Sequence, residues 1–337
     1  MGCGASAGPP GAQQPASVLP SPGRAGGGSA SSSRGPARPS GDGCRIIPDQ
    51  YSSFAEVSQA LRSAGLEASQ LVVGVDFTKS NTWTGANSFG GRCLHESRPD
   101  RRTPYEQVIA CIYGTLEPFD DDNLIPAYGF GDKRTKNRQV FSFLDDDAPC
   151  RSLEEAVQRY QAVARSLLGP PLMLSGPTSF APLVRQAMSL VKRTGEYHIL
   201  LIIADGQVDS VNETVQAIVD ASEYALSIVM VGVGDGPWDR MEEFDDGLPQ
   251  RVFDNFQFVE FNSLSSKYPK EKRDFAFAAH ALMEIPDQYQ TVMRLGYLED
   301  GYHDRLKVHC WHEPIGPPDT PMEPQCVEPF GEPGMGP

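Results

Sequence analysis

Apolar runs of the strand type alternate with helical patterns through the middle of the chain. Six runs have the length and composition of strands, and three of them are almost continuous in Val, Ile and Leu. The predicted strands are 71–77, 124–130, 140–143, 197–204, 226–233 and 257–261. Continuous apolar strands are buried on both faces, so the pattern indicates a mainly parallel sheet.

Helical periodicity fills the intervals between these strands. The predicted helices are 52–64, 105–116, 153–167, 180–192, 213–224 and 273–283. Ser152 and Asn212 are predicted N-caps, and Pro104 is a favoured first-turn residue. Pro286 is expected to interrupt the last long helix. Strands that alternate with helices in this way predict a doubly wound α/β fold, similar to a Rossmann fold, with ligands at the carboxyl ends of the strands.

Composition divides the chain into a folded middle and two tails. The 33 Gly and 29 Pro gather near the two ends, which predicts disordered tails at 1–46 and 301–337 around a domain at 47–300. The net charge of -15 argues against nucleic acid as a partner, because phosphate binding needs clustered cations. Seven Cys at irregular spacing do not form a disulfide framework, so an intracellular location is expected.

The first six residues, MGCGAS, fit an acylation signal. Gly2 is placed for myristoylation and Cys3 for palmitoylation, and two acyl chains give stable membrane anchoring where one does not. The weakly basic tail would favour an anionic leaflet. The expected location is the cytoplasmic face of the plasma membrane or an endomembrane, together with cytoplasm and nucleus. The alternative is an ordinary disordered start of small residues.

Oxygen-bearing side chains occupy three of the predicted strand ends and turns. Asp76, Thr78 and Ser80 alternate at the end of the first predicted strand, and alternate residues point the same way. Asp205 ends the fourth strand, and Thr178 lies in the turn before a helix. Carboxylates and hydroxyls are ligands for Mg²⁺, which takes six oxygens at about 2.0–2.1 Å. The sequence therefore predicts a cation site, with one position left for a carboxylate of an acidic partner protein.

Each element of this set has an ordinary structural alternative when taken singly. Asp76 and Thr78 fit a strand-end turn, Asp205 with Gly206 is a turn signal, and Thr178 fits a helix cap. The prediction rests on all of them occurring in this order, each at a strand end or a helix start.

The pattern Asp-x-Thr-x-Ser, then Thr, then Asp resembles the metal-ion-dependent adhesion site of von Willebrand factor A domains. Thr78 stands where the family has Ser, which keeps the hydroxyl. Further stretches are similar to the copine-type A domain and to the plant RGLG group of copine-like RING ubiquitin ligases. These are 74–81 (GVDFTKSN), 125–132 (IPAYGFGD), 176–182 (GPTSFAP), 202–208 (IIADGQV), 231–238 (VGVGDGPW), 243–246 (EFDD) and 253–259 (FDNFQFV).

The resemblance spans about residues 48–298 and implies cation-dependent protein binding through Mg²⁺, Mn²⁺ or Ca²⁺. The chain has no room for the two C2 domains of copines and no cysteine pairs for a RING finger. The expectation is therefore a binding module without its own catalysis. The alternative is an RGLG-like E3 ubiquitin-protein ligase family member that recruits substrate while ubiquitination machinery supplies the RING.

Enzymatic alternatives find little support in the residues. A phosphatase with an aspartyl nucleophile would need Asp where Thr78 stands. The glycine run 232–236 contains an acidic residue and is expected to be a strand-end turn. A thiol protease would pair Cys111 or Cys150 with His198, which lies in an apolar strand.

Three further polar features have an ordinary structural alternative to a functional role. A late cluster could suggest zinc but lacks paired cysteines and is expected to be fortuitous: His303, His309, Cys310, His312 and Cys326. The acidic runs 120–122 and 145–147 are expected to be solvated turns. Lys79 either contacts the acidic partner or is an ordinary surface lysine.

Overall fold

The computed structural model describes residues 51–98, 101–206, 208–248, 251–306 and 312–319. All of the described residues belong to one compact unit. The predicted acylation sites Gly2 and Cys3 lie outside the described residues, and the domain boundaries remain predictions. No helix among the described residues is both long enough and apolar enough to cross a bilayer.

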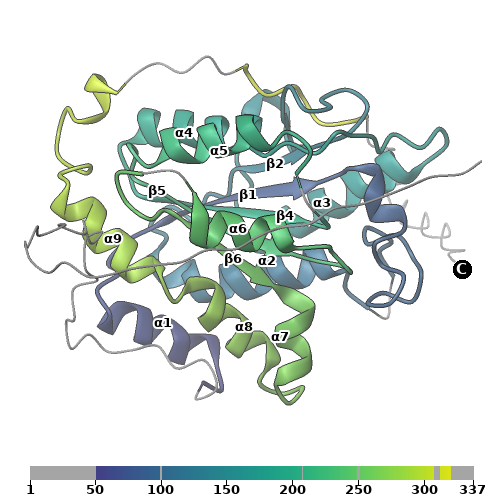
Figure 1. Cartoon of the computed structure of the whole chain (residues 1–337), viewed down its shortest axis with the longest axis horizontal. Coiled ribbons are helices and arrows are strands. Elements are labelled where there is room, and N and C mark those ends of the chain that lie inside the picture. The colour runs from purple at the N-terminus through teal and green to yellow at the C-terminus, as the bar shows by residue number, and fades with distance from the viewer. Residues whose placement is uncertain (1–50, 99–100, 207, 249–250, 307–311, 320–337) are drawn as a thin grey trace, which may run out of the picture. The chain divides into compact units, whose positions relative to one another are not determined.

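A six-stranded sheet forms the centre of the domain (Figure 1). Its strands are β1 (Gln70–Asp76), β2 (Ala127–Phe130), β3 (Phe141–Ser142), β4 (His198–Ala204), β5 (Leu226–Gly232) and β6 (Phe256–Glu260). They lie in the order β3-β2-β1-β4-β5-β6, and every pair is parallel except β2 with β3. All six predicted strands and the doubly wound fold are thereby confirmed.

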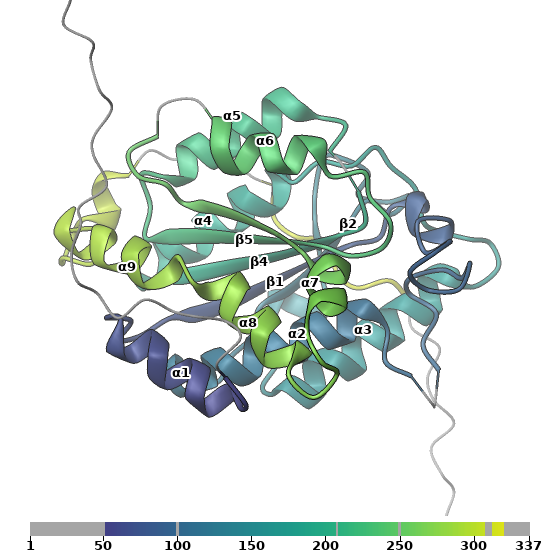
Figure 2. The same cartoon turned by 60° about the horizontal axis from the view of Figure 1, so that its bottom comes forward.

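Helices cover both faces of this sheet. Those described are α1 (Phe54–Ser63), α2 (Pro104–Leu116), α3 (Leu153–Leu168), α4 (Ala181–Thr194), α5 (Val211–Ala221), α6 (Asp239–Gly247), α7 (Phe261–Lys267), α8 (Arg273–Leu282) and α9 (Ile285–Arg294). Figures 1 and 2 show α4 and α5 on one face and α1, α2 and α8 on the other. Every residue of β4 and β5 is buried, as expected for a sheet covered on both sides.

Three helices were missed by the sequence pattern, namely α6, α7 and α9. The prediction that the helix at 273–283 is the last long one is wrong. Pro286 does separate α8 from α9, but it lies in the first turn of α9, where its missing N–H costs no helical hydrogen bond. The predicted cap Asn212 is also wrong, because α5 begins at Val211 after Ser210. Ser152 caps α3 as predicted, with its hydroxyl accepting the Glu155 N–H.

The strand order reverses direction between β1 and β4, and this fixes where a ligand site can form. From β1 the chain moves outward to β2 and β3, and from β4 it moves outward the other way to β5 and β6. The loops after β1 and β4 therefore leave the sheet toward opposite faces, which creates a crevice at the carboxyl ends of these two strands.

Residues 312–319 lie beside the outer edge of the sheet, within the predicted C-terminal tail. The Ser142 N–H donates to the Ile315 carbonyl at 2.9 Å, and the Ile315 N–H donates to the Val140 carbonyl at 3.1 Å. The Arg134 guanidinium donates to the Gly316 carbonyl at 3.2 Å. This part of the tail therefore pairs with β3 and covers an edge that would otherwise present unpaired backbone groups.

Candidate metal centre

Asp76 is the last residue of β1 and is completely buried. Its Oδ1 accepts the Thr78 N–H at 2.7 Å. Its Oδ2 is also buried, and no residue in the described part of the chain donates a hydrogen bond to it. A buried carboxylate oxygen without a donor is costly, because nothing replaces the water that it gave up on folding.

Thr78 and Ser80 follow Asp76 and turn their hydroxyls toward each other. The Thr78 Oγ1 and the Ser80 Oγ lie 2.8 Å apart. Thr78 is buried and Ser80 is half-buried, so the pair lies at the edge of solvent. The alternation that predicted two convergent hydroxyls after the strand is therefore confirmed as a local geometry.

Asp205 brings a second carboxylate to the same place. It follows β4, which pairs in parallel with β1 through the register Val75–Ile203, so both strands end at one edge of the sheet. The Ser80 Oγ donates to the Asp205 Oδ1 at 2.9 Å. The sequence-predicted residues of the first and fourth strands thus meet directly.

Thr178 lies in the adjoining loop, and within the described part of the chain it forms no hydrogen bond to the other four predicted ligands. Its N–H donates to the Asp209 Oδ2 at 2.8 Å, and its carbonyl accepts the Asp209 N–H at 2.9 Å. The loop that carries Thr178 is attached to the site three residues earlier in the chain, because Ser175 and Thr78 form a parallel bridge. Thr178 is therefore held beside the cluster by its backbone, with 7% of its surface exposed.

Electrostatics at this edge disfavour two ionised carboxylates in the absence of a cation. Burial raises the pKa of Asp76 well above its usual value, and the negative charge of Asp205 raises it further. Burial also raises the pKa of Asp205, although hydroxyls from Thr84 and Ser80 oppose the rise. A divalent cation would reverse this balance by compensating both charges at once.

The donor set fits a hard cation. Two carboxylates and three hydroxyls are oxygen ligands of the kind that Mg²⁺, Mn²⁺ and Ca²⁺ accept. No group of three or more His, Cys, Asp or Glu side chains suited to a metal ion occurs in the described ranges, so the cation would depend on hydroxyls. The donorless Oδ2 of Asp76 is the atom that most requires a positive charge.

The sequence missed several residues that complete this cluster. Thr84 donates its hydroxyl to the Asp205 Oδ2 at 2.6 Å. Asn81 holds the turn, since its Nδ2 donates to the Asp76 carbonyl at 3.2 Å and to the Thr78 carbonyl at 3.1 Å. A polar residue one helical turn after Ser80 was the available signal for Thr84. Nothing local in the sequence shows that Asn81 turns inward.

Gly131 is a further missed residue, and its backbone explains why it is glycine. It has φ +84°, a conformation that other residues rarely adopt. A Cβ there would lie 2.4 Å from the Thr78 Cγ2 and 3.4 Å from the Asp76 Oδ1. Glycine therefore allows the loop after β2 to pack closely against Thr78.

An aromatic group lies directly behind the site. His95 is buried and stacks between Phe77 and Tyr105, with ring centroids 4.5 Å and 4.3 Å away. Its Nε2 lies 2.8 Å from the Asp76 carbonyl and its Nδ1 lies 2.9 Å from the Tyr160 hydroxyl. Burial lowers its pKa to about 3, and both of its ring nitrogens are already occupied by these two contacts.

The residues named for the enzymatic alternatives have structural contacts in the described part of the chain. Cys111 and Cys150 are buried thiols, and burial raises the pKa of Cys150 to about 12. The Nδ1 of His198 is bound to the Glu196 carbonyl instead of to a thiol. The Asp235 carboxylate in the glycine run accepts backbone N–H groups of a neighbouring loop, which leaves a turn and not a phosphate site.

The remaining sequence candidates fall at the surface or beyond the described residues. Lys79 is exposed beside the ligand hydroxyls. Asp147 accepts the Tyr128 hydroxyl at 2.8 Å, so the run 145–147 is partly structural and not a purely solvated turn. Asp120 is likewise buried and accepts the Asn123 N–H at 3.0 Å. Of the zinc candidates His303 is buried, whereas His309, Cys310 and Cys326 lie outside the described residues.

Comparison with known proteins finds similarity to copines and to RGLG proteins. A family model described as Copine matches residues 93–300, which include Thr178 and Asp205 and begin after Asp76, Thr78 and Ser80. The chain is 50% identical over 267 residues to the E3 ubiquitin-protein ligase RGLG4 of Arabidopsis thaliana, covering 75% of this chain and 65% of that protein. It is 44% identical over 267 residues to Copine family protein 1 of Caenorhabditis elegans, covering 78% of this chain and 24% of that protein.

The chain therefore spans less than two thirds of the length of these relatives. Among solved structures, the manganese-loaded Plasmodium vivax TRAP protein matches with a TM-score of 0.36 and 9% identity, over 62% of this chain and 74% of that chain.

Proposed function

Because this chain belongs to the copine family, we propose that its folded region is a divalent-cation-dependent protein-binding module. Asp76, Thr78, Ser80, Thr178 and Asp205 would hold Mg²⁺, Mn²⁺ or Ca²⁺. The bound cation would supply positive charge at an open coordination position, where an acidic group of a partner protein could complete its shell.

The observation that carries this proposal is the Asp76 Oδ2. This oxygen is buried, receives no hydrogen bond from the described residues and lies near a second buried carboxylate, Asp205. Buried charges in proteins are paired or coordinate metals, and the nearest charge here has the same sign. A cation explains this arrangement, because it would compensate both carboxylates at once.

The same contacts support binding without catalysis. The hydroxyls of Ser80 and Thr84 donate to the Asp205 carboxylate, which also interacts with the Asp76 side chain. An activated nucleophile needs a free base within hydrogen-bond reach, and both ring nitrogens of His95 are engaged, by the Asp76 carbonyl and the Tyr160 hydroxyl. The hydroxyls are therefore suited to ligate a cation.

Isothermal titration with Mg²⁺ and with Mn²⁺ tests the metal site. The wild-type chain is expected to bind one cation, and Asp76→Ala is expected to lose this binding. Glu67→Ala is a matched control, since it removes the same charge from an exposed residue away from the site. Equal affinity in wild type and Asp76→Ala would refute the site.

The partner is sought with the same pair of proteins. Proximity labelling with wild type and Asp76→Ala should recover proteins that depend on the cation site, and blocked acidic peptides should compete with them. Partners that are labelled equally by both proteins would argue against an acidic group at the cation.

We also propose that the module acts at a membrane surface, on the cytoplasmic face of the plasma membrane or an endomembrane. The support is the acylation signal at Gly2 and Cys3. Mass spectrometry of the cellular protein should find both acyl groups, and Gly2→Ala should move the protein into the cytoplasm and nucleus. An unmodified amino terminus would contradict this part.

A second candidate function is substrate recruitment in ubiquitin ligation. It is favoured by relatives such as RGLG4, which are named E3 ubiquitin-protein ligases and share the copine region. In this case the A domain would bind substrate and a partner would supply the RING. An autoubiquitination assay of the purified chain, with and without an added RING-containing ligase, separates the functions, because activity of the chain alone would show that it is itself a ligase.

A further inference from the structure

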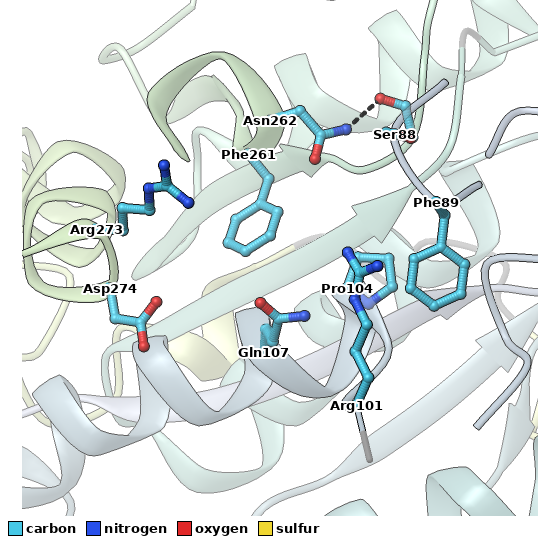
Figure 3. Close-up of a pocket in the computed structure, with 10 residues that line it drawn as sticks. Ser88, Phe89, Arg101, Pro104, Gln107, Phe261, Asn262, Arg273 and Asp274 are labelled. Carbon is cyan, nitrogen blue, oxygen red and sulfur yellow. Dashed lines mark hydrogen bonds between the residues drawn. The ribbon is translucent and has the colours of Figure 1, made fainter. Parts of the chain in front are cut away.

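A cavity of about 340 Å³ opens among the residues drawn in Figure 3. Its walls come from the loop before α2, the first turns of α2 and α8, and the residues that follow β5 and β6. Gly234 comes two residues after β5, and Phe261 follows β6 directly. The cavity is therefore at the carboxyl edge of the sheet, and its volume is in the range of about 300–1,000 Å³ that ligand pockets occupy.

Two guanidinium groups line this cavity. Figure 3 shows Arg101 and Arg273 on opposite sides of the Phe261 ring. The Arg101 guanidinium stacks on the Phe89 ring, 4.8 Å from its centroid. The Arg273 Nε donates to the Tyr268 carbonyl at 3.0 Å. This contact fixes the side chain and leaves its two terminal amino groups for a ligand.

Neither guanidinium forms an ion pair with a residue in the described ranges. The cavity thus gathers two cationic side chains on a chain whose net charge is -15. Arginine presents a planar fork of donors that matches a carboxylate or a phosphate. The cavity is thus suited to an oxyanion.

The other lining residues favour a carboxylate carried by a peptide. Asp274 adds a negative charge, which repels a phosphate dianion more than a carboxylate monoanion. The amide nitrogens of Asn262 and Gln107 donate to the backbone carbonyls of Gly234 and Arg102, so their amide oxygens can accept peptide N–H groups. The ring of Phe261 offers an apolar surface for the methylene groups of a glutamate side chain.

One loop connects the cavity to the metal centre. Thr84, which donates to Asp205, and Phe89, which lines the cavity, lie five residues apart in this loop. The Asp235 carboxylate accepts the Asn87 N–H at 2.7 Å and the Ser88 N–H at 2.9 Å. The Asp235 N–H in turn donates to the Thr84 carbonyl at 2.7 Å, so the two places are held in a fixed relation.

We propose that this cavity is a second subsite for the acidic partner, in which Arg101 and Arg273 bind a carboxylate side chain of the same segment that reaches the metal centre. This inference rests on the proposed function. Two acidic residues in one segment would then bind together, and the second would gain from the high effective concentration that the first creates. The exposed side chain of Trp83, on the same loop, adds contact area for the chain between them.

A peptide series measures the second subsite. Blocked peptides carry one fixed glutamate and a second glutamate after a variable run of glycines, and a matched series has glutamine in the second position. Isothermal titration in saturating Mg²⁺ should show one spacing at which the second glutamate improves affinity by about tenfold. No advantage of glutamate over glutamine at any spacing would overturn the proposal.

Variants test whether Arg101 and Arg273 are responsible for the affinity gained from the second glutamate. The double variant Arg101→Gln, Arg273→Gln should lose the advantage of the second glutamate and bind the glutamine series as wild type does. Arg102→Gln is the matched control, because Arg102 is an exposed neighbour whose side chain does not line the cavity. Unchanged Mg²⁺ affinity in the double variant shows that it is folded. A gain that persists in the double variant would overturn the proposal.

A metal-free measurement separates failure of the cavity from failure of the metal centre. Glutarate added to Asp76→Ala without divalent cations should shift the Nε–Hε resonances of Arg101 and Arg273, and inorganic phosphate should shift them less. Absent shifts, or a stronger response to phosphate, would overturn the carboxylate assignment. Glutarate shifts without Mg²⁺-dependent peptide binding would refute the proposed function and, with it, the coupling of two subsites.

Discussion

Asp76 and Asp132 are buried carboxylates in similar places but with opposite surroundings. Asp76 ends β1, Asp132 comes two residues after the adjacent strand β2, and both have no exposed surface. Asp132 accepts the Thr135 N–H at 2.8 Å and the Arg134 Nε–H at 3.0 Å, with a further bond from the Thr135 hydroxyl. Asp76 accepts one backbone N–H, has one oxygen without a donor, and lies near Asp205.

The difference separates a carboxylate that is satisfied within the chain from one that is not. Both have the same position relative to a strand end and the same burial, so neither criterion separates them. The hydrogen-bond donors separate them: Asp132 accepts three hydrogen bonds, one of them from the Arg134 guanidinium, whereas one oxygen of Asp76 has no donor among the described residues. The two clusters touch through Gly131, which precedes Asp132 and packs on Thr78.

The largest expected effect comes from removing Asp132, whose hydrogen-bond donors all lie within the chain. Asp132→Ala leaves the Thr135 N–H and hydroxyl and the Arg134 guanidinium without their acceptor, which should cost about 3 kcal/mol of unfolding free energy. The loss should be the same in Mg²⁺ and in chelator, because the cluster is internal. Urea unfolding followed by circular dichroism measures it. A loss below about 1 kcal/mol would show that water replaces the carboxylate easily.

Asp76→Asn should act in the opposite way, although the residue is equally buried. In chelator the variant should be at least as stable as wild type, because the new amide can donate to Asp205 where a carboxylate oxygen had no donor. In Mg²⁺ at about 100 times its dissociation constant, wild type should gain about 2.7 kcal/mol and the variant nothing.

Thermal unfolding with and without Mg²⁺ measures both parts of this prediction. Asp132→Asn serves as the control, since it also neutralises a buried carboxylate but should keep the gain from Mg²⁺. A variant at Asp76 that is destabilised in chelator and still stabilised by Mg²⁺ would reverse the roles assigned to the two residues.

The sequence was sufficient for the sheet and for the meeting of Thr78 and Ser80 with Asp205 after the ends of β1 and β4. Strands β4 and β5 are continuous apolar runs, and burial on both faces permits few other arrangements. Asp76 and Asp205 could be placed together because parallel strands end at the same edge. Helix α9 was missed because Pro286 signals an interruption, and whether a new helix follows depends on packing of residues such as Tyr289 and Val292 that are distant in sequence from their contacts.

The distinction between Asp76 and Asp132 was beyond the sequence for a similar reason. Asp132 was noted only within a stretch resembling the family, since its donors come from a turn whose geometry depends on Gly131 and on the bridge from Asp132 to Leu174. Thr84 was missed because its hydroxyl reaches Asp205 across 121 positions of the chain. The hydrogen-bond donors of these carboxylates come together only in the folded structure.

The smallest expected effect concerns a third buried titratable group, at the opposite end of the sheet. His198 begins β4, is 3% exposed, and its Nδ1 lies 2.9 Å from the Glu196 carbonyl. Burial lowers its pKa to about 4, with smaller effects from Glu196, Asp122, Arg193 and His303. Like Asp132 it is satisfied within the chain, so its contribution should not depend on Mg²⁺.

The sign of its pH dependence follows from the lowered pKa. Between about pH 6.5 and pH 4 the unfolded chain protonates this histidine and the folded chain does not, so stability falls as the pH falls through that window. Wild type should lose about 1–2 kcal/mol more than His198→Leu over this range, equally with Mg²⁺ and with chelator. Urea unfolding across pH measures this difference. Parallel profiles for the two proteins would show that His198 is solvated, whereas a difference seen only with Mg²⁺ would mean that acid acts through the Asp76 cluster.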